Sequence, residues 1–281
     1  MLEYLDTGRC PVLGQGPTHL YLTPHPLLRP YVAHYTLCSP RICAPEDEGP
    51  RPPAYLELVP DASGCVVLEN DGGRLSSRLW GPTTKMARVE NDLCSGPLRF
   101  FIEFLPGGMS ALTGWEQAEL ADRRLPLWQV SPGLERALFE ALESSRDLSG
   151  LIARMDEILL SQREIGLPAP LREAMAALQC SGGMLPVRQL GALGHYSERH
   201  LGRLFRQHIG MGAKEFSRLI RINLLLKRLE GPNVFSLTEL AQEFGFYDQA
   251  HFINDFKSVC GVPPGEYRKN QSVFYNETYK F

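Results

Sequence analysis

Two different hydrophobic periods divide the chain. Up to about residue 115, short apolar runs alternate with clusters of Gly, Pro, Asn and Asp, which is typical of short strands joined by turns. These strands predict an antiparallel β-barrel or sandwich, with the long segment Arg41 to Pro53 as a mobile loop. The expected strands are Thr18–Thr23, Tyr31–Leu37, Ala54–Val59, Cys65–Glu69, Met86–Glu90, Leu98–Leu105 and Met109–Thr113.

From Pro132 the apolar positions follow the period of a helix. One stripe contains Leu134, Leu138 and Leu142, and a second contains Leu151, Met155, Ile158 and Leu159. Two amphipathic helices separated by a short polar segment predict an αα-hairpin. Its surface is expected either to mediate dimerisation or to pack against the barrel.

A helix-turn-helix pattern lies between Ser236 and Phe256. Ser236 and Glu239 have the spacing of a capping box, which begins a helix. Ala241 is small enough for a close helix crossing, and Gly245 permits a left-handed turn. Asp248 is placed to cap a second helix, whose apolar face contains Phe252 and Phe256.

The same pattern occurs about fifty residues earlier, from Val187 to Phe205. With Ser197 aligned on Asp248, Gly191 takes the place of Ala241 and His195 that of Gly245. The exposed face of the second helix carries Arg199, Arg203 and Arg206. Basic side chains on such a helix suit the phosphates and guanine edges of a major groove, whereas two ordinary helical hairpins would not explain them.

A long amphipathic helix from about Ala213 to Glu230 is expected to join the two motifs. Its apolar residues form a stripe on one side, and its cations are expected to face solvent on the other. Gly231-Pro232-Asn233 is expected to end the helix. The stripe consists of Phe216, Leu219, Ile220, Leu224 and Leu226, and the solvent-facing cations are Arg218, Arg221, Lys227 and Arg228.

Charge is distributed unequally between the two halves. Residues 171–281 contain 14 Lys and Arg and 10 Asp and Glu, a net charge of +4. The whole chain has 29 Lys and Arg and 32 Asp and Glu, so residues 1–170 contain 15 and 22, a net charge of −7. A mildly basic half joined to an acidic half fits a DNA reader attached to a regulatory module. The basic excess is small, so we expect modest and salt-dependent non-specific DNA affinity.

Motifs of other protein classes are missing from the sequence. It has no nucleophile elbow, Walker loop, zinc-protease helix or dinucleotide-binding glycine motif, so we expect no enzyme, no catalytic residues and no cofactor. The seven cysteines are scattered, without a Cys-x-x-Cys pair, and predict reduced thiols and no metal site. The sequence has neither a signal-peptide pattern nor an apolar run of membrane-spanning length, so we expect a cytoplasmic protein without a membrane partner.

The C-terminal motifs together resemble the DNA-binding domain of the AraC/XylS family of bacterial transcription regulators. The resemblance covers roughly Leu171 to Lys269 and is strongest in the segments Gly245 to Lys257 and Gly261 to Arg268. It implies seven helices in two subdomains, with one long helix holding two recognition helices so that they enter successive major grooves.

Carried over position by position, the resemblance gives candidate DNA-binding residues. They are Ser197, Arg199, Gly202, Arg203 and Arg206 in the first recognition helix, and Asp248, Gln249, Ala250, Ile253 and Asn254 in the second. His195 replaces a turn glycine, Gly202 leaves one reading position without a side chain, and Asn254 stands where a basic residue is frequent. The first helix is therefore expected to provide most of the affinity.

The N-terminal half is similar, more loosely, to sensor-type domains that precede such DNA-binding domains. The similar segments include Trp80-Gly-Pro-Thr83 and Phe104-Leu-Pro-Gly-Gly108. A small molecule would bind inside the barrel, with Tyr31, Tyr55, Trp80 and Trp115 as candidate walls and Arg78 or Arg99 for an anionic group. For each residue taken alone, core packing or solvation is the alternative.

The sequence therefore predicts an α+β protein of four parts. Residues 1–165 would form a sensor or oligomerisation domain with the β-barrel and αα-hairpin, 166–170 a linker, 171–270 an all-α DNA-binding domain and 271–281 a tail. The predicted function is sequence-specific regulation of transcription, by activation through RNA polymerase, with a small-molecule effector or a homodimer as the regulatory element. A constitutive regulator and a helical adaptor that does not bind DNA are the alternatives, and the effector, the promoter and the direction of control are left open.

Overall fold

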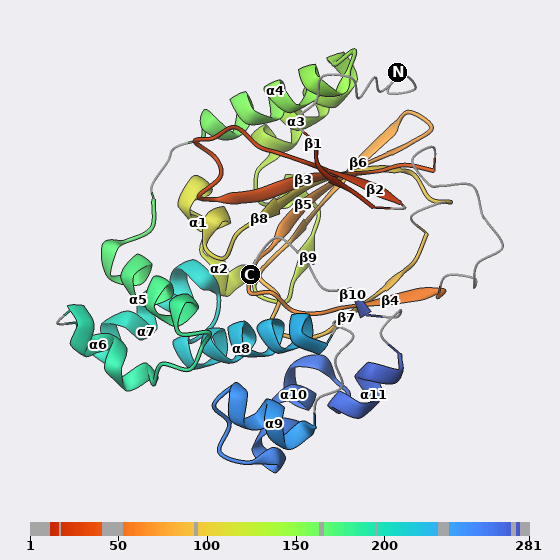
Figure 1. The fold of residues 1–281 in the computed structure, drawn as a ribbon. Coiled ribbons are helices and arrows are strands. Elements are labelled where there is room, and N and C mark those ends of the chain that lie inside the picture. The colour runs from red at the N-terminus through yellow and green to blue at the C-terminus, as the bar shows by residue number, and fades with distance from the viewer. Residues whose placement is uncertain are drawn as a thin grey trace.

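The computed structural model describes residues 12–16, 18–40, 53–92, 95–162, 166–194, 196–229, 236–270 and 274–275. In Figure 1 the strands lie between a helical hairpin on one side and a layer of C-terminal helices on the other. Three predictions lie outside the described residues: the conformation of His195, the helix stop at residues 231–233, and most of the predicted loop from Arg41.

The N-terminal half contains two sheets. A seven-stranded antiparallel sheet has the order β1-β2-β3-β8-β5-β6-β9, and a three-stranded sheet has the order β10-β4-β7. The strands of the large sheet are β1 (Val12–Gln15), β2 (His19–Leu22), β3 (Val32–Cys38), β5 (Cys65–Asp71), β6 (Arg74–Trp80), β8 (Leu98–Phe104) and β9 (Arg124–Leu125). Those of the small sheet are β4 (Tyr55–Leu58), β7 (Ala87–Glu90) and β10 (Phe274–Tyr275).

Short helical elements and a hairpin complete this half. They are α1 (Gly108–Thr113), α2 (Gln117–Leu120), the 3₁₀ helix η1 (Leu127–Gln129), α3 (Pro132–Ser144) and α4 (Leu148–Leu160). The apolar stripes of α3 and α4 share one core with the large sheet. The hydroxyl of Tyr35 in β3 donates a 2.7 Å hydrogen bond to the carboxylate of Asp156 in α4. The αα-hairpin is therefore present and packs against the sheet.

The pattern of strands differs from the prediction in two respects. Met109–Thr113 was expected to be a strand but lies in helix α1, where residues 108–112 are all buried. A short apolar run that is buried on every side has no period, so the sequence alone could not distinguish the two structures. The prediction also omitted β1, β6, β9 and β10. In β6 the positions that face away from the core are Arg74, Ser76 and Arg78, which weaken the hydrophobic signal.

The C-terminal half, within the described residues, consists of seven helices. They are α5 (Ala169–Cys180), α6 (Val187–Gly194), α7 (Glu198–Ile209), α8 (Ala213–Leu229), α9 (Leu237–Glu243), α10 (Gln249–Cys260) and α11 (Pro264–Lys269). One core extends from α5 to α11, with Phe205, Phe216, Phe252 and Phe256 fully buried in it. The expected α+β fold, with an antiparallel sheet domain followed by a helical domain, is confirmed.

The two halves share buried contacts. Val59 and Ala62, from the segment between β4 and β5, belong to the C-terminal core. The buried amide of Asn223 in α8 donates to the carbonyl of Pro60 at 3.0 Å. The strand β10, which follows α11, pairs in parallel with β4. The sheet domain is thus connected to the helical domain through α8 and through the strand that follows α11.

A membrane-spanning helix is not found among the described residues, where no helix is both long and apolar enough.

Candidate nucleic-acid interface and internal cavity

Helices α6 and α7 form the first helix-turn-helix. A Cβ atom on Gly191 would lie 2.5 Å from the carbonyl oxygen of Tyr196, so only glycine allows this close approach after the turn. The hydroxyl of Ser197 accepts a hydrogen bond from the backbone N–H of His200 at 3.2 Å and caps α7. The predicted small residue and N-cap are therefore both present.

Helix α7 is strongly amphipathic. Leu201, Leu204, Phe205 and Ile209 are buried in the C-terminal core. The opposite side, which we call the α7 reading face, consists of Arg199, Gly202, Arg203 and Arg206, and its three arginines are exposed. A guanidinium group on an exposed helix face can make two parallel hydrogen bonds to a guanine edge or contact a phosphate.

Helices α9 and α10 form the second helix-turn-helix. Ser236 and Glu239 form the complete capping box, with both reciprocal hydrogen bonds present. Gly245 has a φ of +66°, which is the left-handed conformation that the turn requires. The carboxylate of Asp248 accepts from the N–H of His251 at 2.7 Å and caps α10. The local geometry that was predicted from these residues is confirmed.

The α10 reading face consists of Gln249, Ala250, Ile253 and Asn254. Gln249, Ala250 and Asn254 are exposed; the side-chain amide oxygen of Gln249 accepts from the hydroxyl of Thr238 at 3.2 Å. Ile253 is half-buried and packs against the C-terminal core, so it presents only part of its side chain. This face is polar and uncharged, in contrast to that of α7.

Asp255, the acid beside Asn254, lies close to the side chains of two other residues. A carboxylate oxygen of Asp255 lies 3.6 Å from Nε of Arg218 in α8, and the other lies 3.6 Å from Nε2 of His251. Since a cation from α8 already lies beside this carboxylate, its repulsion of DNA is weaker than its position in the sequence suggests.

Helix α8 joins the two motifs and carries the predicted apolar stripe. One of its predicted solvent-facing cations, Arg221, is instead half-buried. Its guanidinium donates to the carbonyl of Gly183 at 2.9 Å and lies 4.9 Å from the ring centre of Phe246. Burial lowers the pKa of Arg221. Arg221 is therefore a structural residue that links the two subdomains.

An inner cavity of about 470 Å³ lies between the two sheets of the N-terminal half. In β8, β5 and β6 every second side chain faces it, and residues that pair across the strands form rows on this face. The middle row contains Thr36, Phe101, Val67 and Arg78, and an outer row contains Glu103, Cys65, Trp80 and Arg124. Leu56, Leu58 and Val89 of the small sheet form the opposite wall.

Ion pairs line one end of the inner cavity. The guanidinium of Arg99 donates to both carboxylate oxygens of Asp92 at 2.6 Å and to Glu69 at 2.8 Å. Arg78 also lies 3.3 Å from Glu69. The hydrogen bond with Arg99 lowers the pKa of Asp92. Arg78 and Arg99, the predicted partners of an anionic group, do line the cavity but are already paired with carboxylates.

Three of the four predicted wall residues are not at the inner cavity. Trp80 lines it, but Tyr31, Tyr55 and Trp115 do not. Tyr31 and Trp115 are half-buried and pack against the core of the large sheet, and Tyr55 is 54% exposed. An aromatic residue near a strand end has several apolar surfaces within reach, so residue type alone did not identify the cavity wall. Arg124 and the apolar residues of β4 and β7 were missed.

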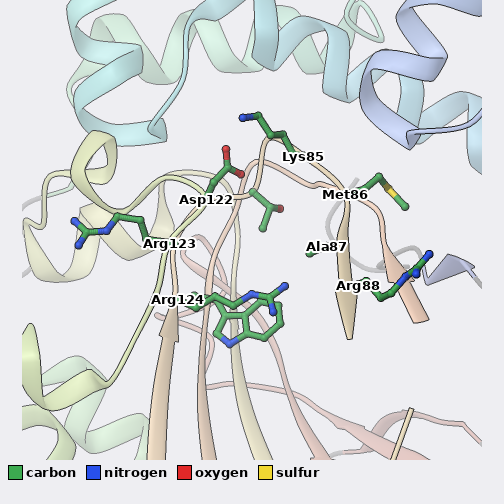
Figure 2. Close-up of a pocket in the computed structure, with 10 residues that line it drawn as sticks. Lys85, Met86, Ala87, Arg88, Asp122, Arg123 and Arg124 are labelled. Carbon is green, nitrogen blue, oxygen red and sulfur yellow. The ribbon is translucent and has the colours of Figure 1, made fainter. Parts of the chain in front are cut away.

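An outer cavity of about 540 Å³ adjoins the inner one and shares Trp80, Arg88 and Arg124 with it. Figure 2 shows that Arg124 lies at its centre, between Lys85 and the strands, below helices of the C-terminal half. The side chain of Arg123 extends away from Arg124 in this view. The residues that line the outer cavity therefore lie on the side of the sheet domain that faces these helices.

The described residues contain no group of three His, Cys, Asp or Glu side chains that could hold a metal ion. Within the same residues, Cys38, Cys65, Cys180 and Cys260 form no disulfide bonds. Burial raises the pKa of the Cys38 thiol to about 12, so this thiol is protonated at neutral pH and is a weak nucleophile. Cys10, Cys43 and Cys94 lie outside the described residues.

Residues 191–270 match a family model described as a helix-turn-helix domain. The chain is 39% identical over 80 residues to the HTH-type transcriptional regulator GlxA of Rhizobium meliloti (strain 1021), covering 28% of this chain and 24% of that protein. It is 31% identical over 84 residues to the XylDLEGF operon transcriptional activator 1 of Pseudomonas putida, covering 29% and 25%. The chain thus spans about a quarter of the length of these two relatives. ToxT from Vibrio cholerae O395 is similar in structure with a TM-score of 0.38, at 13% identity over 92% of this chain and 96% of that one.

Proposed function

We propose that this chain, whose C-terminal domain is an AraC/XylS-type helix-turn-helix domain, is a sequence-specific DNA-binding regulator of transcription. The observation that carries the proposal is the pair of capped recognition helices, α7 and α10, each with an exposed polar reading face. The matched relatives are named as transcriptional regulators, which agrees with the expectation that the chain is not an enzyme.

The two reading faces suit different parts of one DNA site. Arg199 and Arg203 of α7 can pair with guanine edges or phosphates, whereas Gln249 and Asn254 of α10 can pair with adenine edges. Helix α8 holds both motifs on one core, so the two recognition helices would enter successive major grooves on one face of the duplex, about 34 Å apart. Charged contacts on α7 would contribute most of the affinity and of its salt dependence.

The N-terminal half would serve as the regulatory module. Two features support this role: an inner cavity of about 470 Å³, which lies within the size range of ligand sites, and buried contacts with the core that holds α7 and α8. A ligand would act by favouring one arrangement of the two halves. Dimerisation through the N-terminal half and activation through contact with RNA polymerase are further parts of the proposal.

Selection of binding sites from random double-stranded DNA by the full-length protein tests the proposal. We expect an enriched site with a strongly specified half and, about one helical turn (~34 Å) away, a weaker half. A footprint of the selected site should protect both halves on the same face. Binding that ignores both DNA sequence and salt concentration would instead identify a helical adaptor, and sequence-specific binding that no small molecule alters would identify a constitutive regulator.

A further inference from the structure

A hydrogen bond joins the first helix of the second helix-turn-helix to the first residue of its recognition helix. The hydroxyl of Thr238, in the first turn of α9, donates to the amide oxygen Oε1 of Gln249 at 3.2 Å. Gln249 is the first residue of α10, and the N-terminal residues of a recognition helix are the ones that contact base edges. The bond therefore acts on a side chain that belongs to the reading face.

The backbones of both partners are fixed by separate contacts. The capping box orders the first turn of α9, which contains Thr238, and Asp248 caps α10 immediately before Gln249. In the turn between the two helices, the N–H of Phe246 donates to the carbonyl of Ala241 at 2.8 Å. Because these contacts hold the two helix starts in place, the hydroxyl and the amide stay within reach of each other.

The bond determines which end of the Gln249 amide is presented to DNA. A glutamine amide has an acceptor oxygen on one side and a donor NH₂ group on the other, so a side chain that rotates can pair with either kind of base edge. With the oxygen turned toward Thr238, the NH₂ group is the part that is left to meet a base. In the major groove N7 of either purine accepts such a donor, whereas cytosine presents its N4 amine, which is itself a donor.

We propose that Thr238 is a positioning residue for DNA recognition: it orients the Gln249 amide so that α10 selects a purine and rejects cytosine at one position of the weaker half-site. This inference rests on the proposed DNA-binding function and specifies the class of base that one residue of that site reads. Adenine pairs its N7 with the NH₂ group and its N6 amine with the second lone pair of the oxygen, and guanine accepts at N7 and O6. Cytosine would leave the NH₂ group facing another donor.

Water does not remove this effect at the DNA surface. Thr238 and Gln249 are both exposed, so in the unbound protein their hydrogen bond competes with water and contributes little. When α10 enters the groove, water is displaced, and a donor that meets no acceptor becomes costly. The orientation of the amide therefore influences the choice of base more than it influences the stability of the protein.

The other readers lack this constraint, which confines the effect to one position. Asn254 is the second amide of the α10 reading face, and in the part of the chain that the structure describes its side chain makes no hydrogen bond. In the first motif, the positions that correspond to Thr238 and Gln249 are occupied by Arg188 and Glu198, neither of which has an amide. The base pairs read by Asn254 and by α7 therefore serve as internal controls.

Binding of the full-length protein to a selected site and to its base-pair variants tests the proposal. Gln249→Ala identifies the pair that Gln249 reads, as the position at which base preference is lost. There we expect the wild type to prefer a purine over cytosine by about tenfold, which is within the range of one specific base contact. Thr238→Val removes the hydroxyl but keeps the shape, and should lower this ratio by about threefold or more, as expected for one hydrogen bond.

Conservative variants separate the hydroxyl from the rest of the side chain. Thr238→Ser keeps the hydroxyl and should keep the preference for a purine. Thr238→Ala also removes the hydroxyl and is a better helix former, so it serves if the valine variant is not folded by circular dichroism. The matched control is Gln242→Ala, which removes another exposed polar side chain from α9 and should leave the preference unchanged.

A double-mutant cycle shows whether Thr238 acts through Gln249. In a Gln249→Ala background, Thr238→Val should alter the preference at no position. The proposal is overturned if the wild type accepts cytosine as readily as a purine, if the preference survives without the hydroxyl or is lost in Thr238→Ser, or if Gln249→Ala changes no position. Each of these results is compatible with a wild type that selects a specific site. Failure of the DNA-binding function would instead appear as binding of the wild type that ignores sequence.

Discussion

The hydroxyl of Ser110 in α1 lies 2.9 Å from Nδ1 of His208 in α7. This hydrogen bond joins the sheet domain to the first recognition helix, on the side opposite to the exposed arginines. In the neutral ring Nδ1 can accept the hydroxyl proton, whereas a protonated ring can only donate. The protonation state of His208 therefore affects the contact between the two halves.

We expect this contact to weaken on acidification. Burial lowers the pKa of His208. The negative charge of Glu116 raises this pKa, and the positive charge of Arg203 lowers it further. The folded protein therefore binds fewer protons at this site than the unfolded chain, so the stabilisation is complete above the unfolded pKa of about 6.5 and is lost as the pH falls toward the folded pKa. Melting temperatures between pH 8 and 5 should fall more steeply for the wild type than for His208→Gln. Identical profiles would contradict this prediction.

Gly210 makes a second contact between the two halves, and its substitution should be costly. Its φ is +83°, and a Cβ atom would lie 2.9 Å from the carbonyl oxygen of Gln117 in α2. Strain of this kind costs about 1–3 kcal/mol, so Gly210→Ala should lower the melting temperature and loosen α7 from α2. Gly212 is the matched control, because a Cβ atom there meets no atom within 4 Å. Thermal unfolding of both variants, followed by circular dichroism, measures the difference.

The sequence predicted local geometry best where one residue type has a specific backbone role. The caps at Ser197, Ser236 and Asp248 and the left-handed Gly245 are each determined by contacts within a few residues. Such short-range constraints are visible in the order of the residues. The two helix-turn-helix motifs were therefore predicted almost completely.

Features that depend on contacts between distant segments were not predictable in this way. Arg221 was assigned to solvent because a cation on an amphipathic helix is usually exposed, yet Gly183 and Phe246 bury it. Val59 and Ala62 join the core of the other half, and Arg124 reaches the cavity only because β9 pairs with β6. Strand pairing and domain packing decide these positions, and neither is specified by local periodicity.

The arginines of the α7 reading face should dominate binding to DNA. Arg199→Ala and Arg203→Ala should each weaken binding to a selected site by on the order of 1–3 kcal/mol if the residue reads a guanine, and by less if it contacts phosphate. Gel-shift titration measures the loss. Arg136→Ala, which removes an exposed arginine from α3 in the other half, is the control for charge alone. Unchanged affinity in both α7 variants would remove this helix from the interface.

The α10 reading face should gain affinity from an added charge. Asn254 is exposed, and the neighbouring Asp255 is already associated with Arg218 and His251. Asp255 would therefore not neutralise the charge of a new arginine at position 254. Asn254→Arg should therefore increase affinity and steepen the dependence on salt by about one released counterion, with little change in sequence preference if the new contact is to phosphate. Gel shifts across a series of salt concentrations measure both quantities, and Gln129→Arg, at an exposed position of η1, controls for net charge. If Asn254→Arg binds no more tightly than this control at any salt concentration, α10 does not engage DNA, and the weaker half of the selected site must have another origin.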